Sequence, residues 1–177
     1  MLGVCDADKL RLEQSKTAIE LGWKQLDKNL ASSNKKSQHF KKALLHFQHG
    51  LLLDIKSGPA WFACAYAYSL TGDVDESLKF YRKSLVYQPN YTSTHMNIGV
   101  ILLSKGDMKN AFKSLQKASE LEPERGMVHG NLARWYLVNK QLSKAKEELA
   151  LAYKYQKPED TAFLNVIAKY INSAKSQ

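Results

Sequence analysis

The chain has 177 residues, of which 44% are hydrophobic and 24% charged, a composition that is typical of a folded globular protein and argues against disorder. No apolar run approaches the ~18–20 residues of a membrane-spanning helix, so we expect no membrane insertion. The net charge of +9 indicates first a lysine-coated surface and second a surface that favours an acidic partner. No nucleic-acid-binding motif accompanies this charge, and we expect no nucleic-acid partner.

The two cysteines, Cys5 and Cys64, form neither a C-x-x-C pair nor a disulfide framework. We therefore expect a reducing, cytoplasmic location. Cys64 falls in an apolar helical stripe, which predicts a small buried side chain.

Residues 1–57 carry an irregular helix pair. Ala18 is followed by Leu21 and Gly22, and Ala43 by Phe47, spacings of small and large residues that are typical of two packed helices. Gly22 and Ala43 are 21 positions apart, against 12 in the regular segments that follow. The extra residues include the polar run 32–37, so we expect a lengthened helix or turn.

From residue 58 onward, one pattern repeats every 34 residues. Its positions hold Trp61, Cys64, Ala65, Tyr68, Ser77, Tyr81 and Pro89 in the first unit, His95, Ile98, Gly99, Leu102, Ala111, Leu115 and Pro123 in the second, and His129, Leu132, Ala133, Tyr136, Ala145 and Leu149 in the third, where Pro158 comes one position late. Three consecutive units in one register make chance a poor explanation.

Each unit predicts two antiparallel helices. Small residues such as Gly99 and Ala111 face each other, which lets the helices approach closely, and large residues fill the space around the contact. Gly72 and Gly106 are suited to the left-handed conformation that ends a helix, whereas the third unit has Lys140 there and is expected to turn less tightly. The predicted helices cover residues 58–71, 74–88, 92–105, 108–121, 126–139 and 142–155.

The pattern resembles that of the tetratricopeptide-repeat (TPR) family, whose 34-residue helix–turn–helix reads W-x2-L-G-x2-Y, A-x3-F and P. The resemblance implies an all-α, right-handed superhelical solenoid of antiparallel helix pairs with a C-terminal capping helix. The expected divisions are a TPR-like pair with an insertion in 1–57, TPR units in 58–91, 92–125 and 126–159, and a capping helix in 160–177. In the capping helix the segment Phe163–Tyr170 restarts the frame, with Val166 and Ile167 at the L-G positions.

In stacked TPR units the first helices line a concave inner surface, so the resemblance implies a groove for a peptide or protein partner. The sixth position of successive units holds Asn97, Asn131 and Asn165, a ladder of amides able to pair with an extended peptide backbone. The alternative left open is that these amides satisfy neighbouring backbone or each other between repeats. The same helical face is expected to present Phe62, Tyr66, Met96, Val100, Met127, Arg134, Leu137 and Leu164, unless they pack between neighbouring helices.

Other kinds of site are not expected. Chaperone-binding TPR domains grip a C-terminal carboxylate with lysine, asparagine and arginine side chains, and of the corresponding residues here only Asn97 matches. His39, His46 and His49 lack a further ligand at metal-binding spacing. There is no glycine-rich phosphate loop, nucleophile elbow or paired-carboxylate motif, so we expect no enzyme activity, no catalytic residue, no metal and no cofactor.

The sequence thus predicts a non-enzymatic protein–protein interaction scaffold or adaptor that binds an extended segment of a partner. Two alternatives stay open. One is a secretion-type chaperone for an exported protein, since small bacterial chaperones of this kind are similar in layout. The other is a homo-oligomeric assembly scaffold, in which the groove or the end faces bind another copy.

Overall fold

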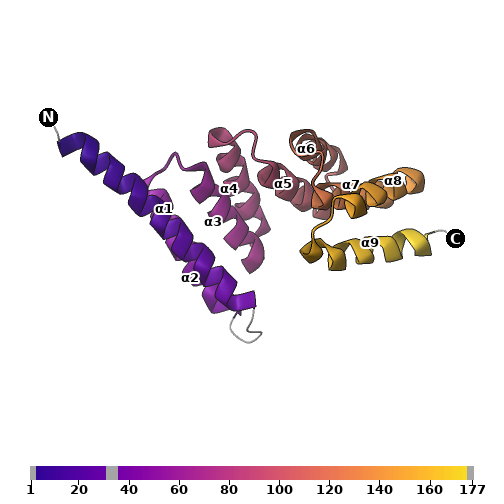
Figure 1. Cartoon of the computed structure of the whole chain (residues 1–177), viewed down its shortest axis with the longest axis horizontal. Helices are drawn as coiled ribbons and strands as arrows, with labels where there is room; N and C mark the ends of the chain where they lie inside the picture. Colours follow the sequence, from indigo (N-terminus) through magenta and orange to yellow (C-terminus); the bar gives the residue numbers. More distant parts are fainter. Residues whose placement is uncertain (1–2, 31–35, 175–177) are drawn as a thin grey trace. The chain divides into compact units, whose positions relative to one another are not determined.

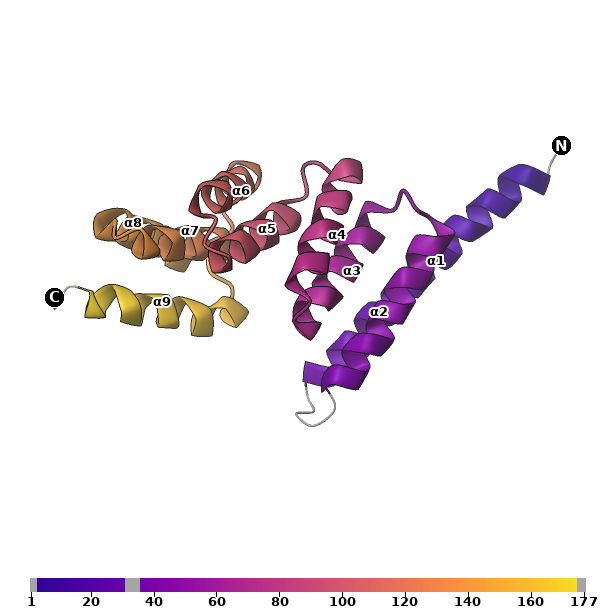
Figure 2. The same ribbon diagram turned by 180° about the vertical axis from the view of Figure 1, so that it is seen from behind.

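The structure is a computed structural model that describes residues 3–30 and 36–174. These residues form helices and connecting turns, with no strand among them, as the all-α prediction requires. The helices belong to two compact units, made of residues 1–89 and 90–177. Figures 1 and 2 show the helices of each unit from opposite sides.

Unit 1 contains two helix pairs, in which α1 (Gly3–Leu30) packs on α2 (Lys36–Leu53) and α3 (Gly58–Thr71) on α4 (Val74–Tyr87). α1 has 28 residues and α2 has 18, whereas the other α-helices have 13 or 14. The extra residues of the first pair therefore lengthen its helices, as predicted. Most of the polar run 32–37 lies outside the described residues.

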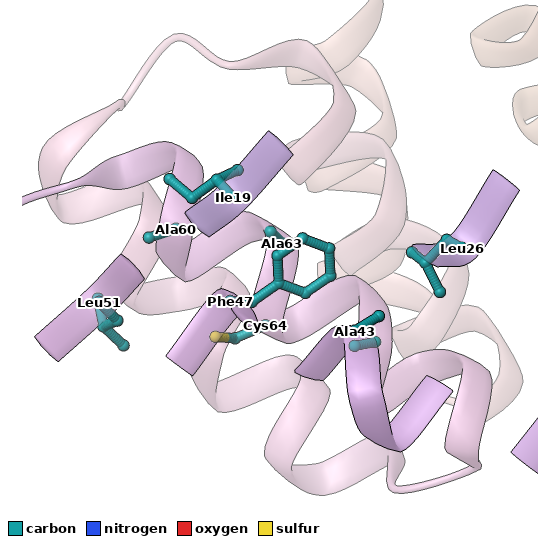
Figure 3. Packing of buried hydrophobic residues seen from close by; sticks show 9 residues of the cluster. Ile19, Leu26, Ala43, Phe47, Leu51, Ala60, Ala63 and Cys64 are labelled. Carbon is teal, nitrogen blue, oxygen red and sulfur yellow. The ribbon is translucent and has the colours of Figure 1, made fainter. Parts of the chain in front are cut away.

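The core of unit 1 lies between α1, α2 and α3 (Figure 3). Phe47 is fully buried at its centre, beside the small residues Ala43 and Ala63. Gly22 lets α1 approach this ring closely, because a Cβ there would collide with it. Cys64 is also fully buried, as predicted, and this burial raises the pKa of its thiol to about 12. The thiol is therefore protonated and acts as a small apolar side chain.

Unit 2 contains two further helix pairs and a final helix. They are α5 (Thr92–Ser104) with α6 (Met108–Leu121), α7 (Gly126–Val138) with α8 (Leu142–Lys154), the 3-10 turn η1 (Pro158–Asp160) and α9 (Thr161–Ser173). A Cβ on Gly99 would lie 2.6 Å from Leu115 Cγ and 3.2 Å from the carbonyl oxygen of Ala111. This is the close helix approach that the repeat pattern predicts.

The six helices predicted from the repeat end within one residue of the observed boundaries. Gly72 and Gly106 adopt the left-handed conformation, with φ of 87° and 79°. Lys140 adopts it too, with φ of 57°, and the Gln141 amide donates to the Tyr136 carbonyl over 2.9 Å. The prediction of a looser third turn was therefore wrong. The left-handed conformation costs a lysine about 1–2 kcal/mol of backbone strain. The turn is tight nevertheless, because the packing of the two helices requires this conformation at residue 140.

The last helix, α9, has a different register from the one predicted. Its buried residues are Leu164, Ile167 and Ile171, which pack against the α7–α8 pair. Val166 and Tyr170, expected at core positions, are 51% and 61% exposed. The prediction that the repeat frame continues unchanged into α9 was therefore wrong.

The register of α9 is displaced by two residues. Val128 packs α7 into a cluster with residues of α5 and α6, and Trp135 Nε1 donates to the carbonyl of Met108 over 2.8 Å. Leu164 and Ile171 take the corresponding places on α9, each of them 36 residues later in the sequence rather than 34.

The longer connector before α9 explains this displacement. The connectors 88–91 and 122–125 have four residues each, whereas 155–160 has six and includes η1. The Asp160 carboxylate accepts a hydrogen bond from the Lys157 amide over 3.1 Å within that turn. Two extra residues rotate the sequence of α9 by about 200° about its axis, which places different side chains against α7.

Candidate functional site

A groove of about 440 Å³ runs between α7 and α9 of unit 2. Its lining consists of Arg134, Leu137, Val138, Phe163, Val166, Ile167 and Tyr170. Three of these side chains are strongly exposed: Val138 at 50%, Val166 at 51% and Tyr170 at 61%. Contiguous exposed apolar side chains in a concave site are typical of a ligand-binding groove.

The groove forms because α7 and α9 are in close contact near their starts. A Cβ on Gly130 would lie 2.6 Å from Leu164 Cδ2 and 2.8 Å from Phe163 Cε1. The absence of a side chain at Gly130 therefore lets α9 settle against α7. Ile167, only 4% exposed, belongs both to the core of unit 2 and to the lining of the groove.

Arg134 is the only charged residue in the lining of this groove. Its guanidinium carries five N–H donors and no acceptor, so it suits a carboxylate or a backbone carbonyl on a ligand. Arg134 and Leu137 were both expected in a groove from the sequence, and both line this one. Their neighbours from α9 were missed, because the unchanged repeat frame assigned Val166 and Tyr170 to the core.

The three asparagines have different environments. Asn97 is half-buried, Asn131 is only 3% exposed, and Asn165 is exposed. The Asn131 side-chain amide donates to the Met127 carbonyl of its own helix over 2.8 Å. Asn165 Oδ1 accepts a hydrogen bond from the Tyr153 hydroxyl of α8 over 2.9 Å, and Asn165 does not line the groove. Because of the shift in α9, Asn165 is not equivalent to Asn131, so the expected ladder of equivalent amides does not form.

The remaining expected residues lie at several places. Met96 is buried, and Val100 and Met127 are half-buried in unit 2. Leu164 is fully buried against α7, in agreement with the alternative that it packs between neighbouring helices. Phe62 and Tyr66 belong to unit 1, where their rings stack at 6.4 Å and where Trp23 lies 5.5 Å from the ring of Tyr66.

A buried histidine in unit 2 has a structural role. His129, at the position of Trp61 in the first unit, contacts Glu148 Oε2 through Nδ1 at 2.8 Å and the Pro123 carbonyl through Nε2 at 2.7 Å. The hydrogen bond to Glu148 and the bond to Pro123 raise the pKa of His129, although desolvation opposes this shift. Since both partners accept, the imidazole donates from both nitrogens when it is protonated. Packing was expected at this position from the sequence, but nothing in the repeat pattern pointed to Glu148.

Within residues 3–30 and 36–174, no group of three histidine, cysteine, aspartate or glutamate residues is placed to hold a metal ion. Nor does any helix in the described part of the chain combine the length and apolar character needed to cross a membrane.

Sequence models of the tetratricopeptide repeat match residues 60–90 and 102–170, which together make up more than half of the chain. The chain belongs to the TPR family. TPR modules are generally non-catalytic and mediate interactions between proteins, so an interaction scaffold is the general role that the family and fold support.

Several solved TPR structures share this fold. PilF from Pseudomonas aeruginosa is 22% identical, with a TM-score of 0.74 over 94% of this chain and 74% of that one. MamA from Desulfovibrio magneticus is 18% identical, with a TM-score of 0.68 over 92% and 90% of the two chains. YrrB, described as a TPR protein with an unusual peptide-binding site, is 16% identical, with a TM-score of 0.60 over 88% and 84%. A comparison with curated proteins finds no significant match. At these identities the similarity shows the fold alone.

Proposed function

We propose that this TPR protein is an interaction scaffold that holds a short apolar segment of a partner protein in the α7–α9 groove. The observation that carries the proposal is the exposure of Val138, Val166 and Tyr170 around a groove with a partly buried arginine. Covering these side chains removes apolar surface from water, at about 25 cal/mol per Å².

Arg134 favours a ligand that carries a carboxylate. No carboxylate lines the groove. An aspartate or glutamate of the ligand would therefore supply a negative charge opposite the guanidinium of Arg134. A bidentate arginine–carboxylate pair adds geometric specificity as well as energy. The net charge of +9 also favours the approach of an acidic segment. YrrB supports the choice of a peptide ligand, since it is a TPR protein with a peptide-binding site.

Selection from a displayed library of random peptides, about 12 residues long, tests the proposal and does not require that the partner be identified first. We expect the wild-type chain to enrich peptides that combine large apolar residues with an aspartate or glutamate. Arg134→Glu should reverse the preferred charge and enrich lysine or arginine. Val166→Asp should weaken binding of the wild-type peptides about tenfold or more, which corresponds to ~1.4 kcal/mol.

Two matched variants serve as controls. Lys146→Glu reverses an exposed charge on α8 outside the groove, and Val86→Asp changes a valine on α4 that is 69% exposed. Both should bind the selected peptides as the wild type does. Peptides that bind the groove variants and the controls equally well would move the binding site elsewhere on the molecule.

A further inference from the structure

α1 carries a stripe of exposed side chains along one face, which we name the α1 stripe. It consists of Asp6, Leu10, Gln14, Thr17, Leu21 and Lys24, all exposed. Leu10 is 60% and Leu21 45% exposed, although leucines of an amphipathic helix normally face a neighbour. The stripe is therefore a face of α1 that no other described part of unit 1 covers.

The spacing of the stripe is that of a helix–helix seam. Leu10, Gln14, Thr17, Leu21 and Lys24 follow one another at alternating intervals of four and three residues. This alternation is the heptad spacing that keeps side chains on one line along a helix packed against another helix.

The other side of α1 is already occupied by unit 1. Ser15 is buried and its hydroxyl donates to the Gly50 carbonyl of α2 over 2.8 Å. Arg11 reaches the Leu53 carbonyl at the end of α2. Figure 2 shows that the N-terminal end of α1 extends beyond α2. Four residues of the stripe, from Leu10 to Leu21, line a hollow of about 510 Å³, and His46 and His49 of α2 form its other side.

We propose that the α1 stripe is a dimer interface, on which the α1 stripe of a second copy of this chain packs in antiparallel orientation. A two-fold axis between Gln14 and Thr17 places Leu10 of each copy against Leu21 of the other. Gln14 then meets Thr17 of the other copy at the centre, where a polar pair sets the register of a helix seam.

The charges of the stripe favour this orientation. Asp6 and Lys24 lie at its opposite ends, so antiparallel pairing brings Asp6 of each copy close to Lys24 of the other. Parallel pairing would set Asp6 against Asp6 and Lys24 against Lys24, which like-charge repulsion disfavours. Glu13, at the edge of the stripe, pairs with Lys16 of its own helix at 2.8 Å and is neutralised locally. The interface lies within unit 1, so it stands or falls independently of the proposed peptide groove.

Charge reversal followed by sedimentation equilibrium from about 1 to 100 µM tests the proposal. We expect the wild type to dimerise in this range, and Asp6→Lys and Lys24→Glu each to weaken dimerisation about tenfold or more. Both the double variant D6K/K24E and an equimolar mixture of the two single variants should recover it, because opposite charges again face each other. Asp6 also lies in the first turn of α1, where an acidic side chain favours the helix. Recovery in the double variant separates the interface from that local effect.

Glu147→Lys and Lys146→Glu, exposed reversals on α8, change the net charge by the same amounts and should leave dimerisation unchanged. A wild type that stays monomeric at 100 µM would overturn the proposal. So would single variants that dimerise like the wild type, or a double variant and mixture that both stay monomeric.

Discussion

His129 of α7 and Glu148 of α8 make a partly buried contact, with 2.8 Å between Nδ1 and Oε2, which is an ion pair when the imidazole is protonated. The second ring nitrogen of His129 bonds the Pro123 carbonyl, so one side chain ties together the two helices of a repeat and the connector before it. The side chain of His129 is 7% exposed and that of Glu148 is 21% exposed, which shields the pair from solvent.

This pair predicts that stability depends on pH. Folding raises the pKa of His129. Its contribution to the free energy of unfolding is therefore complete at a pH below the pKa that His129 has in the unfolded chain, and is lost as the pH rises through its pKa in the folded protein. We expect wild type to exceed Glu148→Gln in free energy of unfolding by about 1–3 kcal/mol near pH 5.5. The difference should shrink towards pH 9, as measured by urea denaturation. Parallel pH profiles for the two proteins would show that the pair contributes no charge-dependent stability.

Two glycines at equivalent repeat positions should respond differently to alanine. A Cβ on Gly126 would lie 2.8 Å from the carbonyl oxygens of both Ala152 and Tyr155, whereas a Cβ on Gly58 would meet the Gln88 side chain. The backbone atoms near Gly126 cannot move away from an added methyl group, whereas the flexible side chain of Gln88 can. We expect Gly126→Ala to destabilise by about 1–3 kcal/mol and Gly58→Ala by less than ~1 kcal/mol in denaturant melts. Equal losses would contradict this explanation.

The displaced register of α9 predicts opposite effects at adjacent positions. Ile167 is 4% exposed and Val166 is 51% exposed. Ile167→Ala should therefore cost about 2–5 kcal/mol of folding free energy, and Val166→Ala less than ~0.5 kcal/mol. Chemical denaturation of the two variants measures both values. A larger loss at Val166 would restore the unchanged repeat frame.

The inward position of Asn131 predicts a structural rather than a ligand-binding role. Asn131→Ala should lower stability by about 1 kcal/mol, because it removes the bond to Met127, and should leave the affinity for selected peptides unchanged. Tyr170→Ala should do the reverse, since that ring is exposed in the groove. Circular-dichroism melts and peptide titrations on both variants measure the two effects. Weaker peptide binding by a well-folded Asn131→Ala protein would show that the Asn131 amide contacts the peptide.

Much of the fold was predictable because its determinants are local. The six repeat helices begin and end where helical periodicity and turn residues place them, and Gly72 and Gly106 take the left-handed conformation that a tight turn requires. The close contact of Gly99 with Leu115 follows from residue size alone. These features depend on neighbours within one 34-residue unit, so the sequence of the unit contains the information.

The candidate groove depended on information that the repeat pattern lacks. Its composition on the α9 side follows from the six-residue connector 155–160, which rotates that helix and brings Val166 and Tyr170 beside Arg134. Extending the repeat at a constant spacing of 34 residues does not predict this rotation of α9.

The family, the helix boundaries and the small-residue contacts within each repeat follow from the sequence alone. Three features emerge only in the folded chain: the face of α9 that meets α7, the different surroundings of Asn131 and Asn165, and the contact of His129 with Glu148. The physical reason is that the first set is governed by backbone conformation and side-chain size over a few turns of helix. The second set depends on how separately formed helices pack, where a change of two residues in a connector exchanges a buried face for an exposed one.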